Sequence, residues 1–150
     1  MVPIGPVPFT LAILGVAFLG AMLPPPWAAG SLGAYLLLGL CGLPVFAGFN
    51  AGPGVLLGPT GGYLAGYFLL ALAVSLARKK PLPLQWLAAA AGMSGCYLLG
   101  TLWYTLVTGA TFLSGLVLCV VPFVLPDALK ITLALLLARA LQRRMAKRPT

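Results

Sequence analysis

Asp127 is the only acidic residue in the chain, and Lys130 follows it three residues later. The residues around both are almost all apolar, as in PFVLPDALKITLALLL. A charge at the centre of a membrane helix costs about 2.5 to 3.5 kcal/mol on insertion scales, so an ionisable pair in such a stretch indicates a binding site. A separation of three residues puts both side chains on one face of a helix, where they can neutralise each other or bind a polar ligand.

A second group of candidate site residues lies in the segment AGFNAGPGVLLGPTGGY. They are Asn50, Thr60, Gly61, Gly62 and Tyr63. Asn50 is compatible with a turn or a ligand contact. Tyr63, like Tyr35, Tyr67 and Tyr97, is compatible with a pocket wall or with helix packing. Gly61 and Gly62 either let helices approach closely or let a ligand reach the backbone. The segment lacks the GK[ST] ending of a phosphate-binding loop, which argues against nucleotide binding.

The composition is that of an integral membrane protein. Hydrophobic residues make up 61% of the 150 residues, charged residues 7%, and the mean hydropathy is +1.09, whereas soluble domains carry about 25% charged residues. We therefore expect one all-α transmembrane domain, residues 1–150, in contact with the lipid bilayer. The net charge of +8 is interpreted as a topology signal and not as a nucleic-acid surface, because the basic residues gather after apolar spans.

Catalytic and metal chemistry have little support in the sequence. There is one carboxylate, no histidine, and three widely separated cysteines without a CxxC pair. These residues form neither a carboxylate pair, nor a nucleophilic triad, nor a metal-ligand set. We expect a protein that is not an enzyme and that has no metal and no cofactor.

The apolar pattern predicts five membrane spans, each of roughly 17 to 24 residues, which is the length needed to cross about 30 Å of hydrocarbon. They are Val7–Leu23, Ala28–Phe46, Pro59–Ala77, Leu84–Val107, and a last span that begins near Pro126 and ends in the basic tail. The stretch Thr111–Leu125 is predicted to be an interfacial or re-entrant segment before the last helix, since Pro122 and Pro126 favour a break. Pro126 is then expected in the first turn of that helix.

Two basic clusters set the expected orientation. Arg78–Lys80 and Arg139–Arg148 are separated by two predicted crossings, so both can be cytoplasmic, with the C-terminus inside. This arrangement puts Asn50 outside and Asp127 near the outer end of the last helix. It also puts Met1 outside, which is awkward for insertion, and we therefore expect a further helix upstream, six in all.

Four segments together resemble one family. VPFTLAILGVAFLGAML, YLLLGLCGLPVFAGF, LLGPTGGYLAGY and PFVLPDALK occur in the order found in the BioY family, the biotin-specific S components of energy-coupling-factor (ECF) vitamin transporters. The resemblance runs from Val7 to about Leu141. The chain departs from the family pattern at Ala12, where Gln is usual, and at Pro24–Pro26, where a basic residue is usual.

The resemblance implies a six-helix membrane protein of a prokaryotic cell membrane that captures biotin from outside. It implies delivery of biotin to a membrane coupling protein and two cytoplasmic ATPases, with no ATP site in this chain. The family's Asp and Lys of the last helix correspond to Asp127 and Lys130, and its loop near the vitamin corresponds to Asn50 and the GPTGGY residues.

Two other functions stay open at this point. The chain can be a small structural or assembly membrane protein in which Asp127 and Lys130 form an intramembrane ion pair. It can also be an S component for another vitamin. For biotin itself, the residues do not decide whether Asp127 or Lys130 faces the ureido ring or the carboxylate.

Overall fold

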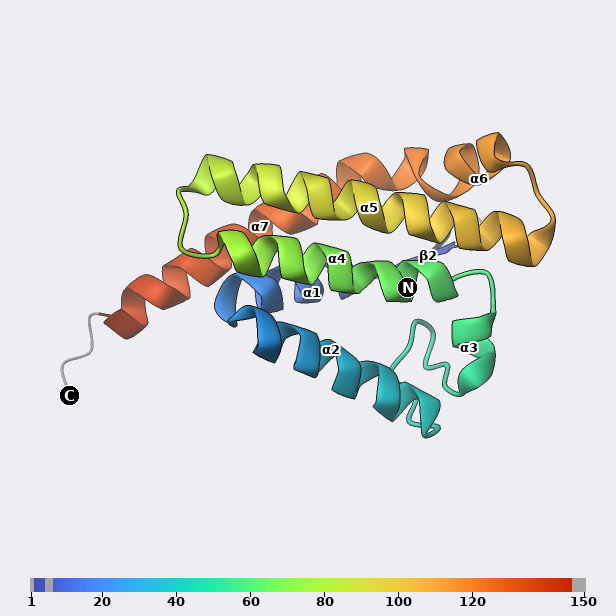
Figure 1. The fold of residues 1–150 in the computed structure, drawn as a ribbon, viewed down its shortest axis with the longest axis horizontal. Helices are drawn as coiled ribbons and strands as arrows, with labels where there is room; N and C mark the ends of the chain where they lie inside the picture. Colours follow the sequence, from blue (N-terminus) through green and yellow to red (C-terminus); the bar gives the residue numbers. More distant parts are fainter. Residues whose placement is uncertain (1, 5–6, 147–150) are drawn as a thin grey trace.

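Helices form most of the structure, a computed structural model that describes residues 2–4 and 7–146 (Figure 1). The helices are α1 (Ala12–Met22), α2 (Pro25–Leu40), α3 (Pro53–Leu57), α4 (Gly61–Ala77), α5 (Leu82–Thr108), α6 (Phe112–Cys119) and α7 (Val121–Ala146). Before them, β1 (Val2–Ile4) pairs antiparallel with β2 (Val7–Phe9), so that Pro3 is opposite Pro8. The expected all-α helical bundle is confirmed, apart from this short hairpin.

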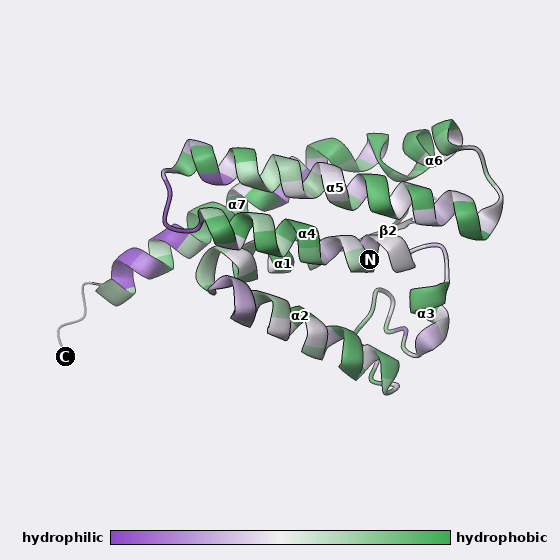
Figure 2. Ribbon diagram, in the orientation of Figure 1, coloured by the Kyte–Doolittle hydropathy of each residue, from purple (hydrophilic) through white to green (hydrophobic). Residues whose placement is uncertain are grey.

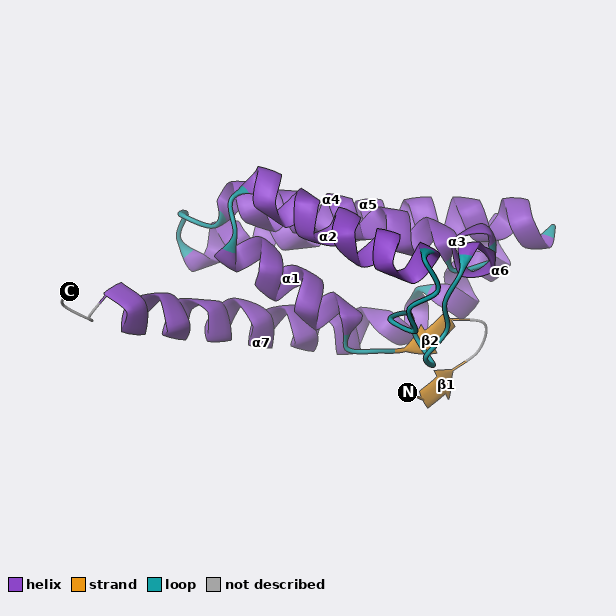
Figure 3. Cartoon of the chain, turned by 90° about the horizontal axis from the view of Figure 1, so that it is seen from below, coloured by secondary structure: helices purple, strands orange, loops and turns teal. Residues whose placement is uncertain are grey.

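The bundle is organised around α4 and α1. α4 packs along α5 on one side and against α2 on the other, while α1 packs against both α4 and α7. Figure 3 shows α1 between α7 and the layer that contains α2, α4 and α5. The core is built from small and aliphatic side chains of these helices, among them Ala17, Leu70, Val74 and Leu135, each fully or almost fully buried.

Two predicted spans agree closely with the structure, and three differ in extent. α4 and α5 begin and end within two residues of the prediction. The first span was predicted from Val7, but residues 7–9 are extended and paired with β1, and α1 begins at Ala12. Pro8 contributes to this difference, because a proline disfavours the helical conformation of the residue before it, here Val7. α2 begins at Pro25 and ends at Leu40, where Gly42 turns the chain at φ +95°.

The predicted start of the last helix was wrong. α7 begins at Val121, and Pro126 lies inside it instead of in its first turn. A separate helix does precede it: α6 occupies residues 112–119, and the chain breaks at Val120 (φ −119°, ψ −55°). Pro122 accounts for the earlier start, because proline is well suited to the first turn of a helix, where its missing N–H has no partner to lose.

By length and hydropathy, α5 and α7 could cross a membrane, whereas α1 and α4 are apolar but shorter. The side chains of α7 are arranged as lipid contact requires. Leu125, Leu129 and Leu133 are 82%, 64% and 45% exposed, while Asp127 and Lys130 on the opposite face are buried. Hydrocarbon outside and charge inside is the arrangement expected for a membrane helix.

The polar turns gather at the two ends of the bundle. At one end, Arg139 of α7 donates from Nη2 to the Lys80 carbonyl at 2.9 Å, which joins α7 to the α4–α5 turn. Gln142 donates to the Ala21 carbonyl at 2.9 Å, which brings the α1–α2 turn to the same end. The segment between α2 and α4 lies at the other end (Figure 1). The basic clusters therefore share one end, as predicted, although positions 147–150 lie outside the described residues.

Candidate functional site

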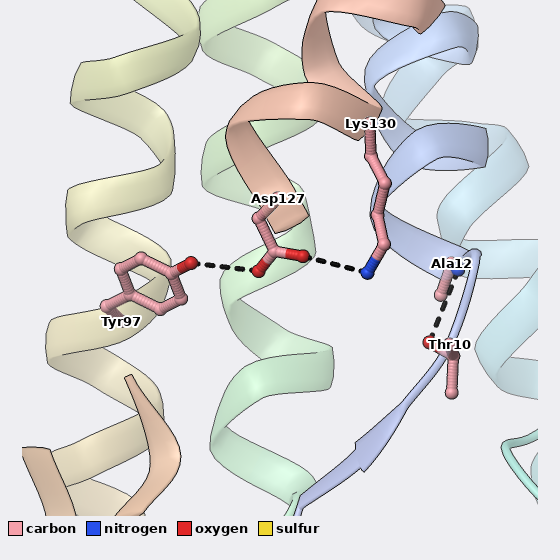
Figure 4. A network of polar contacts seen from close by, with 5 residues as sticks. All are labelled: Thr10, Ala12, Tyr97, Asp127 and Lys130. Carbon is pink, nitrogen blue, oxygen red and sulfur yellow. Dashed lines mark hydrogen bonds and ion pairs between the residues drawn. The ribbon is translucent and has the colours of Figure 1, made fainter. Parts of the chain in front are cut away.

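Asp127 and Lys130 form a buried ion pair on α7. Lys130 Nζ lies 2.9 Å from Asp127 Oδ1, and the two residues are 5% and 1% exposed. The second carboxylate oxygen, Oδ2, accepts a hydrogen bond from the Tyr97 hydroxyl of α5 at 2.8 Å (Figure 4). The predicted contact between residues three apart is confirmed, and both carboxylate oxygens have a donor. A fully hydrogen-bonded pair is the form in which charges are tolerated in an apolar interior.

A small cavity of about 40 Å³ adjoins this pair. Five helices and the segment before α1 converge on it. Its lining residues are Thr10, Ile13, Tyr63, Tyr67, Met93, Cys96, Tyr97, Cys119, Phe123, Asp127 and Lys130. The Lys130 side chain extends from α7 toward the segment that carries Thr10 (Figure 4). The charged groups are therefore reachable from this small space and are screened from lipid by the surrounding helices.

A much larger cavity, of about 830 Å³, lies between α1, α2, α4 and the segment that joins α2 to α4. Its walls are mostly aliphatic and aromatic, and its polar side chains are hydroxyls and one amide. The polar lining residues are Thr10, Ser31, Tyr35, Asn50, Thr60, Tyr63 and Tyr67. Ligand sites of small organic molecules have this size and this mixture of apolar wall and few polar groups.

The two cavities share a wall made by Thr10, Tyr63 and Tyr67. Tyr63 and Tyr67 are four residues apart on α4, which puts them on one face of the helix. The Tyr63 hydroxyl is held 3.3 Å from Thr101 Oγ1 of α5. Any molecule that occupies the large cavity and contacts Asp127 must therefore pass between these side chains.

The segment after α2 is folded into a rim over the large cavity. The backbone N–H of Phe46 donates to the Asn50 carbonyl at 3.1 Å, and Asn50 Nδ2 donates to the Ala47 carbonyl at 2.8 Å. Phe46 packs its ring edge-on against Tyr35, with centroids 5.6 Å apart. The side chain of Asn50 thus holds a turn, and the residue also lines the cavity.

Gly61 and Gly62 lie against α3 and α5, outside the lining of both cavities. A Cβ at Gly61 would overlap the Leu56 carbonyl, and one at Gly62 would overlap the side chain of Trp103. The indole Nε1 of Trp103 donates to the Gly58 carbonyl at 2.9 Å, which ties the start of α4 to α5. Close packing is therefore the role that the geometry gives to both glycines.

The structure brings the candidate residues into two groups. Asn50, Thr60 and Tyr63 line the large cavity, and Asp127, Lys130 and Tyr63 line the small one. Two further residues line both cavities: Tyr67, for which the sequence left a pocket wall or helix packing open, and Thr10, which was not among the candidates. The spacing of Tyr67 from Tyr63 was a usable signal, whereas Thr10 offered none because its segment was taken for the start of a helix.

Comparisons with known proteins identify the family of this chain. The model of the BioY family matches residues 1–147. The chain is 38% identical to a probable biotin transporter BioY of Pyrococcus horikoshii over 94% of this chain and 84% of that one. It is 37% identical to the biotin transporter BioY of Thermotoga maritima over 95% of this chain and 85% of that one.

Its fold is similar to a crystal structure of the S component for biotin from an ECF-type ABC transporter. The TM-score is 0.84 and the identity 26%, over 92% of this chain and 77% of the other. A family match over nearly the whole chain, supported by these relatives and by the shared fold, shows that the chain belongs to the BioY family.

Proposed function

We propose that this protein binds biotin from the outer side of the cell membrane and delivers it to an ECF module for uptake. The observation that carries the proposal is the large cavity of about 830 Å³, which one wall of side chains separates from the small cavity at the buried Asp127–Lys130 pair. The names of the relatives support biotin as the ligand.

The chemistry of biotin suits this arrangement. Its thioether ring and aliphatic chain match the aliphatic and aromatic walls of the large cavity, where Val16, Leu32 and Leu64 contribute. Its ureido ring offers two N–H donors, for which the Asp127 carboxylate is a charged acceptor. Its terminal carboxylate suits Lys130. Either end of biotin can face the pair.

Contact between biotin and the pair requires a local rearrangement. Thr10, Tyr63 and Tyr67 separate the two cavities, so biotin must displace these side chains to reach Asp127. Lys130 and Tyr97 already satisfy both carboxylate oxygens. Biotin would exchange part of this network for its own donors and acceptors, so that no charge is left without a partner.

Energy for uptake would come from partner subunits. We propose a transmembrane coupling protein and two cytoplasmic ATPases as these partners, with the basic end of the bundle and the C-terminus on the cytoplasmic side and several helices crossing the membrane. Positive charge on the cytoplasmic side is the general rule for membrane proteins and supports this orientation.

Equilibrium binding of radiolabelled biotin to the detergent-purified chain tests the ligand. We expect saturable binding at one site per chain, with competition by unlabelled biotin but not by thiamine or riboflavin. Binding of another vitamin in place of biotin would assign a different substrate. Absence of binding by any vitamin would make the ion pair a structural feature. Delivery is tested separately, by biotin uptake in cells that lack their own transporter, with and without a coexpressed ECF module.

A further inference from the structure

A groove of about 550 Å³ opens at the end of the bundle where the α4–α5 turn meets α7. Its lining residues are Arg78, Lys79, Lys80, Gln85, Arg139, Gln142, Arg143 and Ala146. Figure 2 shows the same region as the most hydrophilic part of the molecule, on the turn before α5 and on the last turns of α7. Among the residues that the structure describes, none lines both this groove and either cavity.

Hydrogen bonds hold the groove in shape. Gln85 is only 3% exposed, and its Nε2 donates to the carbonyls of Arg78 at 2.7 Å and Lys80 at 3.1 Å. Arg139 donates from Nε to Gln85 Oε1 at 3.3 Å and from Nη2 to the Lys80 carbonyl. The turn and α7 are therefore fixed relative to each other, and the remaining basic side chains project from a rigid frame.

The positive charge of this groove cannot be balanced by carboxylate side chains of the chain. The sequence contains nine basic residues and one acidic residue. That acidic residue, Asp127, is buried and paired with Lys130. Since five basic residues converge on the groove, its counter-charge must come from another molecule.

Exposed leucines flank the basic residues. Leu76, two residues before Arg78, is 72% exposed, and Leu84 in the first turn of α5 is 45% exposed. Leu141, between Arg139 and Arg143 on α7, is 44% exposed. A complementary ligand therefore has an anionic head and a hydrocarbon tail.

We propose that this groove binds the headgroup of an anionic phospholipid. The phosphate lies among Arg78, Lys79 and Arg143, and the acyl chains lie on the neighbouring leucines. Basic pockets between membrane helices near the headgroup level are suited to such lipids. The leucines distinguish this ligand from a free phosphate ion, and their position beside apolar helices favours a lipid over an acidic segment of a partner protein.

Two neighbouring arginines provide a matched test. Arg143 lines the groove and Arg144 does not, so R143Q and R144Q change the net charge equally. A double variant, K79Q/R143Q, removes two groove charges. In the part of the chain that the structure describes, Lys79 and Arg143 make no side-chain hydrogen bond or ion pair, so these variants should fold.

The measurement is thermal unfolding of the detergent-purified full chain during titration with phosphatidylglycerol, with phosphatidylcholine and inorganic phosphate as separate arms. A ligand that binds only the folded state raises the midpoint with its concentration, which gives its dissociation constant. We expect stabilisation by phosphatidylglycerol alone. Binding should weaken about fivefold in R143Q and about 25-fold in K79Q/R143Q, and change less than about twofold in R144Q.

Four results would overturn the proposal. Equal stabilisation by both phospholipids would show that headgroup charge is not recognised, and equal stabilisation by inorganic phosphate would make the groove a small-anion site. Equal weakening in R143Q and R144Q would show diffuse attraction instead of a built site. A polyglutamate peptide that binds through Lys79 and Arg143, while phosphatidylglycerol does not, would assign the groove to a protein partner.

Discussion

The Tyr97 hydroxyl on α5 donates a hydrogen bond of 2.8 Å to Oδ2 of Asp127 on α7. Lys130, on the same helix as Asp127, donates to the other carboxylate oxygen. Asp127 therefore links α7 to α5 and also neutralises the charge of Lys130. This network links α7 to α5 and presents a charge-neutral polar centre to cavities whose other described lining residues are uncharged.

Tyr97→Phe should destabilise the fold more than Tyr63→Phe. The first change removes a donor from a buried carboxylate, a bond of about 1.5 to 3 kcal/mol, and the second removes a neutral hydroxyl pair with Thr101, a bond of about 0.5 to 1.5 kcal/mol. Reversible unfolding in mixed detergent micelles gives both values. Equal losses would show that the charge of Asp127 does not strengthen its bond to Tyr97.

Asp127→Asn should weaken biotin binding about ten- to hundred-fold. The amide keeps the shape of the side chain but removes a charged acceptor, which contributes about 1.5 to 3 kcal/mol to a hydrogen bond. Equilibrium binding to purified protein measures the effect. Ser94→Ala is a suitable control, since Ser94 is exposed on α5 and bonds within its own helix. Unchanged affinity in a folded Asp127→Asn protein would place the site elsewhere.

Lys130→Met should reduce discrimination between biotin and an ester of its carboxylate. The substitution keeps an apolar side chain of similar length and removes the charge that suits the carboxylate. Lys79→Met removes an exposed lysine and serves as the matched control for net charge. The two dissociation constants, for biotin and for its methyl ester, give the discrimination directly. If it stays at the wild-type ratio, Lys130 does not contact the carboxylate.

Gly62→Ala should destabilise the fold by about 1 to 3 kcal/mol, because a Cβ there overlaps Trp103 and also lies 2.8 Å from the Leu99 carbonyl. Gly33→Ala in α2 is the matched control. Its Cβ meets nothing within 4 Å in the described part of the chain, and alanine favours the helix by about 1 kcal/mol. Thermal unfolding in detergent measures the stability of both variants relative to the wild type. A stable Gly62→Ala protein that fails to bind biotin would instead favour the ligand role for this glycine.

Position 50 should be labelled from outside the cell, and positions 79 and 144 only from the inside. The reason is that the basic clusters share one end of the bundle, opposite the rim that carries Asn50. Single cysteines at these positions, in a chain whose native Cys41, Cys96 and Cys119 are replaced, can be tested with a membrane-impermeant maleimide. Labelling of position 50 from the inside alone would reverse the proposed orientation.

The sequence by itself determined the features that depend on neighbours along the chain. The Asp127–Lys130 contact follows from helical geometry at a spacing of three. The limits of α4 and α5 follow from the glycines, prolines and basic residues that bound two apolar runs. The gathering of the basic clusters at one end follows from counting crossings between them. Each of these features is decided by residues close together in the sequence or by the order of the segments along the chain.

The tertiary structure alone decided what distant segments do together. Tyr97 lies 30 residues from Asp127, and only the relative rotation of α5 and α7 selects it among the tyrosines of the chain. Asn50 and Asp127 were expected in one site, but the wall that includes Tyr63 and Tyr67 divides the space into two cavities. The role of Gly62 likewise depends on Trp103, across a helix interface. Residue spacing does not decide which helices pack together, because that depends on which faces meet and not on where each helix begins.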